Sequence, residues 1–295
     1  MYPASFDYIA PTTLDEALAV LADRGDEVKV LAGGQSLIPL MKLRFAQPPM
    51  LVDINRIPGL DTIDVPNGYM RIGALVRNND VVASDVVRRT NHTVAHAAPW
   101  VSDPLVRNLG TVCGSLAHAD PQGDWASVML ACGASVVAKT SRGERVIPMT
   151  ELITGVFSTQ LGADELVTEV RVPRYAGPSG GTYLKLERKV GDYATVGVAT
   201  HLTLDGSGRI AAAGVALTAV GPTNIKAVDA EHALIGASPD AEAFREAGRL
   251  AAAAADPRDD VRGSAEYKRH VVDIFVQRGL ATAAQIAASS ASGQA

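Results

Sequence analysis

The feature that most constrains the fold of this chain is a pair of adjacent glycines placed directly after a short apolar segment. The apolar run 28–31 is typical of a buried strand, and the stretch LAGGQSL, residues 31–37, continues from it. Adjacent glycines can adopt positive φ and turn successive backbone N–H groups outward, which suits phosphate oxygens. A plain tight turn explains this stretch equally well, so a ligand site needs a second signal.

A second glycine-containing loop, residues 108–121, supplies that signal because it repeats the same chemistry. It places Gly114 and Ser115 after an apolar segment, and Asp124 follows at a position where it could bind sugar hydroxyls. Neither loop matches the GxGxxG or GxxxxGKS/T motif, which argues against Rossmann and P-loop nucleotide sites. Two amide-lined turns and an acid instead suit a dinucleotide with a pyrophosphate.

Apolar periodicity and turn residues predict an α+β chain without regular βαβ alternation. Thr13 and Glu16 form a predicted capping box for a helix that Gly25 closes. The other predicted helices cover residues 37–44, 79–87 (capped by Asn79), 124–131, 226–236, 240–255 and 264–288. The predicted strands cover residues 28–31, 50–54, 69–72, 134–139, 144–148, 165–172, 182–187, 195–204 and 209–220.

A segment rich in proline and glycine, residues 173–181, is the best linker candidate in the chain. It predicts two domains, residues 1–175 and 176–288, followed by a flexible tail at residues 289–295. A chain of 295 residues is also longer than one hydrophobic core usually serves.

Composition narrows the class of function. The net charge of −5 and the lack of a basic run argue against a nucleic-acid partner. The only cysteines are Cys113 and Cys132, whereas an iron–sulfur cluster normally needs four thiolates, so this chain alone cannot ligate one. The six histidines form no metal-binding pair, so we expect no metal site. The first residues lack a leader pattern, which favours a cytoplasmic location.

Taken together, these motifs resemble the FAD-binding medium subunits of the molybdenum hydroxylase family, with the greatest likeness to carbon monoxide dehydrogenase medium subunits. The likeness extends over nearly the whole chain. It is carried by residues 32–37, 111–115 and 117–121 with Asp124, then 185–189 with 191–194, 221–223 and 267–270. The resemblance implies a PCMH-type FAD-binding domain of two α+β subdomains, followed by a small antiparallel sheet with a helical bundle.

The resemblance also implies FAD as the cofactor and a set of residues that bind it. The pyrophosphate would contact the backbone of residues 32–36 and 111–115, and Asp124 would bind ribityl or ribose hydroxyls. Lys185 and Tyr193 would lie near the isoalloxazine ring and are the candidate catalytic residues. The full predicted set is Ala32, Gly33, Gly34, Gln35, Ser36, Leu37, Thr111, Cys113, Gly114, Ser115, Ala117, His118, Asp120, Asp124, Leu161, Lys185, Asp192 and Tyr193.

Two positions depart from the family pattern. The family usually has two glycines where this chain has Cys113 and Gly114, and a requirement for positive φ there would strain a cysteine. The carbon monoxide enzymes often have histidine where this chain has Gln35, whereas heterocycle, nicotine and aldehyde hydroxylases more often have glutamine. The second departure leaves the substrate of the complex open.

The expected role is electron transfer. The resemblance implies a small iron–sulfur subunit and a large molybdenum-cofactor subunit as partners in a dimer of heterotrimers, with a quinone or another external electron acceptor. It also leaves room for an association with the inner face of the membrane. Two alternatives remain: a self-contained flavin oxidase or reductase, and a structural subunit whose cofactor site is empty.

Overall fold

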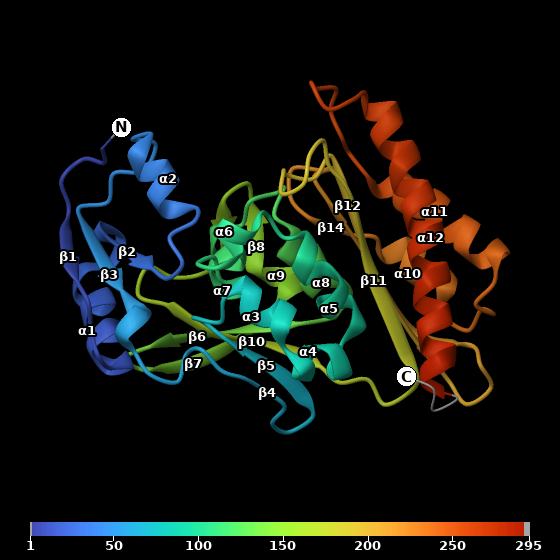
Figure 1. Ribbon diagram of the computed structural model, residues 1–295, viewed down its shortest axis with the longest axis horizontal. Helices are drawn as coiled ribbons and strands as arrows, with labels where there is room; N and C mark the ends of the chain where they lie inside the picture. Colours follow the sequence, from blue (N-terminus) through green and yellow to red (C-terminus); the bar gives the residue numbers. More distant parts are fainter. Residues whose placement is uncertain (1, 292–295) are drawn as a thin grey trace.

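The computed structural model describes residues 2–291, which form three units arranged side by side (Figure 1). The first unit is a small parallel sheet in the order β1-β3-β2, formed by Asp7–Ile9, Met50–Asp53 and Val28–Leu31. Helix α1, Leu14–Arg24, packs beside it and buries Ala17, Leu18 and Leu21. The predicted capping box is confirmed, and so is the closure of the helix at Gly25.

The second unit is an antiparallel sheet in the order β4-β5-β10-β6-β7. Its strands are Ile63–Asp64, Tyr69–Gly73, Leu166–Pro173, Ser135–Thr140 and Gly143–Pro148. Short helices lie between this sheet and the third unit (Figure 1). They are α3 (Asn78–Ala83), α4 (Asp85–Thr90), α5 (His92–Ala97), α6 (Pro104–Arg107), α7 (Val112–His118) and α8 (Asp124–Ala131).

Two local predictions in this unit were wrong. The single helix predicted over residues 79–87 is two helices, because the Ser84 hydroxyl accepts a hydrogen bond from the Val87 N–H and starts a new helix, α4. The second glycine-containing loop is largely helix α7, which begins after Thr111. The Thr111 hydroxyl accepts a hydrogen bond from the Gly114 N–H, and this N-cap outweighs the low helix propensity of glycine.

Smaller elements complete the first two units. Helix α2 spans Leu37–Lys42 and therefore ends two residues before the predicted limit. Helix α9 (Met149–Leu152) leads into a hairpin of β8 (Ile153–Gly155) and β9 (Ser158–Thr159). Three-residue 3-10 turns occur at Gly25–Glu27, Ile54–Arg56 and Ala98–Trp100.

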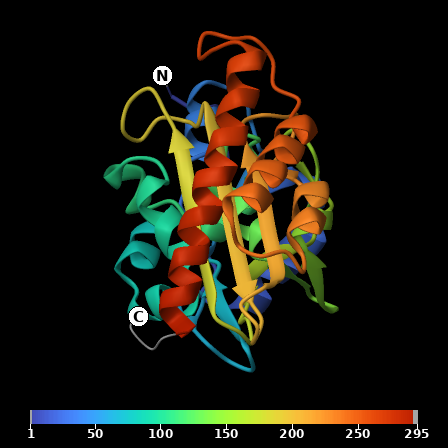
Figure 2. The same cartoon turned by 90° about the vertical axis from the view of Figure 1, so that its right-hand side faces the viewer.

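The third unit is an antiparallel sheet in the order β11-β12-β13-β14, formed by Ser179–Leu186, Val196–Leu204, Ile210–Thr218 and Ile225–Lys226. Helices α10 (Val228–Leu234), α11 (Ala241–Ala254) and α12 (Ala265–Ala291) cover one face (Figure 2). Helices α5 and α8 of the second unit contact the other face. Because both faces are covered, every residue of β12 is buried, including His201.

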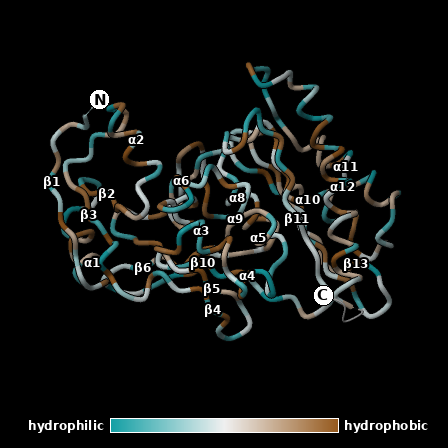
Figure 3. Tube along the Cα trace, viewed as in Figure 1, coloured by the Kyte–Doolittle hydropathy of each residue, from teal (hydrophilic) through white to brown (hydrophobic). Residues whose placement is uncertain are grey.

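The limits of this unit correct two predictions. Strand β11 begins at Ser179, so the predicted linker 173–181 is reduced to residues 174–178. Helix α12 continues to Ala291, so residues 289–291 of the predicted tail are helical, and residues 292–295 lie outside the described part of the chain. The longest helix, α12, contains both hydrophobic and hydrophilic residues along its length (Figure 3). No helix within residues 2–291 is long and apolar enough to cross a membrane.

Two hydrophobic clusters form the core. One fills the first two units and also takes in Tyr183, Ala199 and Ala216 from the C-terminal sheet. The other lies between that sheet and helices α10–α12. The C-terminal sheet therefore contributes to both cores, which fixes it firmly against α5 and α8. The division of the chain at residue 175 stays a prediction.

Candidate functional site

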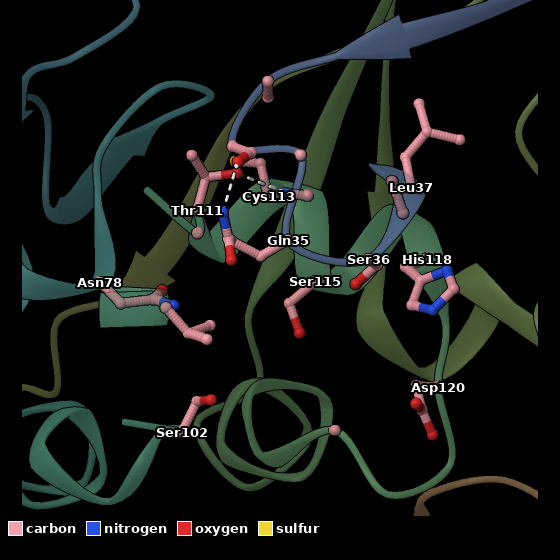
Figure 4. Close-up of a pocket in the computed structure, with 18 of the residues that line it drawn as sticks. Gln35, Ser36, Leu37, Asn78, Ser102, Thr111, Cys113, Ser115, His118 and Asp120 are labelled. Carbon is pink, nitrogen blue, oxygen red and sulfur yellow. Dashed lines mark hydrogen bonds between the residues drawn. The ribbon is translucent and has the colours of Figure 1, made fainter. Parts of the chain in front are cut away.

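A cavity of about 570 Å³ lies where the three units meet. Its walls come from β2 and the turn after it, from α7 and the start of α8, from residues 161–167, and from the loop between β11 and β12. Every residue that the sequence analysis proposed for the site lines this cavity. Figure 4 shows Gln35, Ser36, Ser115, His118 and Asp120 among them.

The first wall is the turn after β2. Within residues 2–291, none of the backbone N–H groups of residues 33–36 donates a hydrogen bond, although the turn lines the cavity. Gly34 has a φ of +70°, a conformation that residues with a side chain rarely adopt. The Gln35 amide donates to the Gly33 carbonyl at 3.3 Å and so supports the turn from within. The exposed amides make this wall suited to an anion.

Gly33 allows two backbone segments to approach each other closely. A β-carbon at Gly33 would lie 2.2 Å from the carbonyl oxygen of Leu109, so the two backbones approach as closely as glycine allows. Arg77 holds this approach, since its guanidinium donates to the Leu109 carbonyl at 2.7 Å and to the Asn55 side chain. Asn55 in turn donates to the Ala32 carbonyl at 2.8 Å. The first turn is therefore fixed to the segment that precedes α7.

The second wall is the exposed side of α7. Ser115 and His118 face the cavity, whereas Cys113 is buried behind them (Figure 4). Cys113 has helical geometry, so the strain considered for a cysteine at this position does not arise. Burial raises the pKa of its thiol to about 12, and Sγ lies 3.7 Å from the Ile72 carbonyl oxygen. Cys132 is also buried, with a thiol pKa of about 11. Both cysteines are packing residues.

His118 and Asp120 form the outer edge of this wall. The His118 imidazole packs against the Phe157 ring with 5.0 Å between centroids, and burial lowers its pKa, so it is neutral at pH 7. Asp120 accepts a hydrogen bond from the Gln122 N–H at 2.9 Å. A neutral histidine beside a carboxylate offers hydrogen bonds to a bound ligand without adding a positive charge.

The third wall carries buried charges from two units. The Lys185 ammonium, 1% exposed, donates to the Asp124 carboxylate at 3.0 Å and to the Trp100 carbonyl at 3.0 Å. The Tyr183 hydroxyl donates to the other Asp124 oxygen at 2.6 Å. Burial raises the pKa of Asp124, and these two partners oppose that rise. Both Asp124 oxygens therefore already have hydrogen-bond partners within the protein, whereas the sequence predicted only that this residue would bind ligand hydroxyls.

The loop between β11 and β12 closes the same end of the cavity. Tyr193 is about half exposed, and burial and the nearby Asp120 carboxylate raise the pKa of its phenol. Asp192 accepts hydrogen bonds from Arg262 and Arg188, and the Arg262 interaction contributes most to a pKa of about 2. The carboxylate is therefore ionised throughout the neutral range.

Sequence reasoning missed several residues of the lining, including Asn78, Ser102 and Gln122. Asn78 is buried, and its side-chain oxygen accepts a hydrogen bond from the Trp125 indole at 2.9 Å. It follows Arg77, the cap of α3, in a stretch without glycine or a recognisable motif. No local signal marked these positions.

Two protein families match this chain. Residues 4–175 match the family described as FAD binding domain in molybdopterin dehydrogenase. Residues 181–283 match the family described as CO dehydrogenase flavoprotein C-terminal domain. The first match alone spans more than half of the sequence.

Individual relatives agree with these families. The 6-hydroxypseudooxynicotine dehydrogenase complex subunit alpha of Paenarthrobacter nicotinovorans is 39% identical, with 96% of each chain covered. The carbon monoxide dehydrogenase medium chain of Hydrogenophaga pseudoflava is also 39% identical, over 95% of this chain and 97% of that one. A solved structure of carbon monoxide dehydrogenase from Hydrogenophaga pseudoflava, in a form lacking the Mo-pyranopterin moiety, matches with a TM-score of 0.92 and 40% identity, over 97% of this chain and 99% of that one.

Proposed function

The chain belongs to the family of FAD-binding medium subunits of molybdenum hydroxylases, and from this premise we propose that it passes electrons from the iron–sulfur clusters of a partner subunit to an external acceptor. FAD is the cofactor of this family. A flavin accepts electrons singly and releases one or two, which suits a carrier between clusters and an acceptor. The chain's own two buried cysteines leave the clusters to another subunit.

The free amides of residues 33–36 are the observation that carries this proposal. Unbonded N–H groups that line a cavity are suited to the pyrophosphate of a dinucleotide, and the cavity continues from there to Lys185 and Tyr193. We assign the phosphates to the first turn and α7, and the ring to the end formed by Lys185 and Tyr193. The residues present therefore fit FAD.

The proposed complex contains a small iron–sulfur subunit and a large molybdenum subunit, as a dimer of heterotrimers in the cytoplasm. Its acceptor would be a quinone or another external oxidant. Carbon monoxide oxidation to carbon dioxide on the large subunit is the first candidate reaction, because a carbon monoxide dehydrogenase medium chain is among the nearest relatives reported above.

A second candidate keeps the same subunit role in an N-heterocycle or aldehyde hydroxylase. Gln35 favours this candidate, because heterocycle, nicotine and aldehyde hydroxylases more often carry glutamine at this position. The equal identity to the 6-hydroxypseudooxynicotine dehydrogenase subunit also supports it. Identification of the large subunit that co-purifies with this chain decides between the two, since the substrate pocket belongs to that subunit.

Purification of the chain alone tests the subunit role. We expect it to bind FAD, to show a flavin absorption spectrum, and to oxidise neither carbon monoxide nor a heterocycle or aldehyde. Oxidation of any of these substrates by the isolated chain would establish a self-contained enzyme instead. Absence of FAD binding would favour a structural subunit.

A denaturation experiment tests the variant with covalently attached flavin. Attachment through Cys113 is disfavoured, because its thiol is buried and has a pKa of about 12. We therefore expect acid or heat denaturation to release all of the flavin into the supernatant. Flavin that stays attached to the precipitated chain would contradict this expectation.

A further inference from the structure

Most side chains of the segment between α11 and α12, residues 255–264, are exposed. One of its side chains behaves differently. Arg262 lies in a turn, yet only 13% of its side chain is exposed. Its guanidinium donates to the Tyr193 carbonyl at 2.8 Å and to the Asp192 carboxylate at 3.0 Å. Arg262 thus contacts two consecutive residues of the loop that closes the cavity.

Arg262 is itself held by a rigid support. Its backbone N–H donates to the Asp260 carboxylate at 2.8 Å, and the Lys268 ammonium donates to the other oxygen of that carboxylate, also at 2.8 Å. Lys268 belongs to α12, is 3% exposed, and donates a further hydrogen bond to the Arg258 carbonyl at 2.8 Å. The guanidinium is therefore anchored to the longest helix of the C-terminal unit.

The two hydrogen bonds of the Arg262 guanidinium go to the Tyr193 backbone carbonyl and the Asp192 side chain, and not to the Tyr193 ring. Asp192 also accepts a hydrogen bond from the Tyr193 N–H at 2.8 Å, so the peptide units on both sides of Tyr193 are held in place. A second arginine, Arg188, reaches the same carboxylate at 3.2 Å, but its side chain is 56% exposed. The buried guanidinium is the stronger constraint, because exposed ion pairs contribute little.

We propose that Arg262 is a positioning residue that orients Tyr193 toward the flavin end of the cavity through its two contacts with residues 192 and 193. The proposal rests on the function proposed above. Arg262 does not line the cavity; it acts by fixing the backbone from which the Tyr193 ring projects. Its planar fork suits this task, because it binds a carbonyl and a carboxylate at the same time.

A double-mutant cycle on the full chain tests the proposal, with FAD dissociation constants and flavin reduction potentials as measurements. We expect Arg262→Gln to weaken FAD binding by about tenfold and to shift the potential, because hydrogen bonds to a charged group are lost. In a Tyr193→Ala background, the same substitution should change FAD affinity by less than about twofold, because the positioned ring is gone. Arg262→Lys should recover part of the affinity.

Arg188→Gln is the matched control, since it removes the exposed arginine from the same carboxylate, and we expect less than about a twofold change in affinity. Equal effects of Arg262→Gln with and without the Tyr193 ring would overturn the proposal and assign Arg262 a general structural role. Should Arg262→Gln fail to fold, Arg262→Lys enters the same cycle in its place. A wild-type chain that binds no FAD would refute the proposed function itself, whereas FAD binding unaffected by Arg262→Gln refutes only this inference.

Discussion

One wall of the cavity presents backbone N–H groups, whereas the opposite wall presents buried charged side chains. The turn at residues 33–36 offers its amides whatever the side chains are, provided that glycine permits the conformation. The opposite wall depends on Lys185, Asp124 and Asp192, each held by partners from distant segments. The difference teaches that a turn with free backbone amides can be recognised in a sequence by its glycines, whereas a wall of buried charges is built by tertiary contacts.

The largest effect that distinguishes the two walls is expected from Asp124→Ala. This substitution removes the nearer carboxylate of the buried Lys185 ammonium, which keeps the Trp100 carbonyl at 3.0 Å and the Glu187 carboxylate at 3.6 Å. We expect the free energy of unfolding, measured by urea denaturation, to fall by about 3–5 kcal/mol. Glu144→Ala, which breaks the exposed ion pair with Lys139, should cost under about 1 kcal/mol. Similar losses of unfolding free energy in both variants would mean that the buried Lys185–Asp124 pair contributes no more than an exposed pair.

A smaller effect is expected on the amide wall from Gly33→Ala. The new methyl group would overlap the Leu109 carbonyl and push the two segments apart. Overpacking of this kind costs about 1–3 kcal/mol, so FAD titration should show affinity lower by roughly 10- to 100-fold. Gly206→Ala is the control, because a β-carbon there meets no atom within 4 Å, and it should bind FAD normally. Unchanged affinity in Gly33→Ala would separate the glycine from the phosphate site.

A thiol-labelling experiment tests whether the Cys113 side chain of α7 is accessible from the cavity. Cys113 and Cys132 are buried, and their thiols have raised pKa values. We expect no modification of the native chain by a thiol reagent at pH 8, and modification of both residues after unfolding. Rapid labelling of Cys113 in the native chain, slowed by FAD, would place its thiol at the cofactor.

The smallest expected effect concerns pH. Backbone amides do not titrate, and His118 is neutral above its lowered pKa. Tyr193 stays protonated below its raised pKa, and Asp192 stays ionised far above a pKa of about 2. The folded-state pKa of Asp192 lies below its usual value, so its stabilisation is present at neutral pH and is lost only in acid. We therefore expect FAD affinity to change by less than about twofold between pH 6.5 and 8.5. A steeper change would point to Asp124, whose pKa burial raises.

Local sequence signals predicted the fold well where the determining contacts are themselves local. The capping box of Thr13 and Glu16 lies within four residues, and α1 begins where it was expected. Local signals failed at α7. Gly114 suggested a loop, and the Thr111 cap that starts a helix was not recognised in the sequence. The break between α3 and α4 at Ser84 was missed for the same reason.

The residues of the site also fall into those that local sequence signals predicted and those that only tertiary contacts bring together. The glycines at residues 33, 34 and 114 marked the cavity from the sequence alone, and the wall contains every residue of the predicted set. The partners of the charged wall are far apart in the chain: Tyr183 is 59 residues from Asp124, and Arg262 is 70 residues from Asp192. No local pattern encodes contacts over such separations, so only the folded chain reveals which side chains orient Lys185 and Tyr193.

The cavity is lined by segments that lie far apart in the chain, and this has a consequence for biosynthesis. Domains generally fold as they leave the ribosome, from the N-terminus onward. The cavity, however, takes its walls from residues as far apart as Lys29 and Tyr193, and the support of Tyr193 comes from Arg262. An unfinished polypeptide therefore lacks the complete cavity. With FAD bound in this cavity, as proposed above, insertion of the cofactor follows the synthesis of nearly the entire protein.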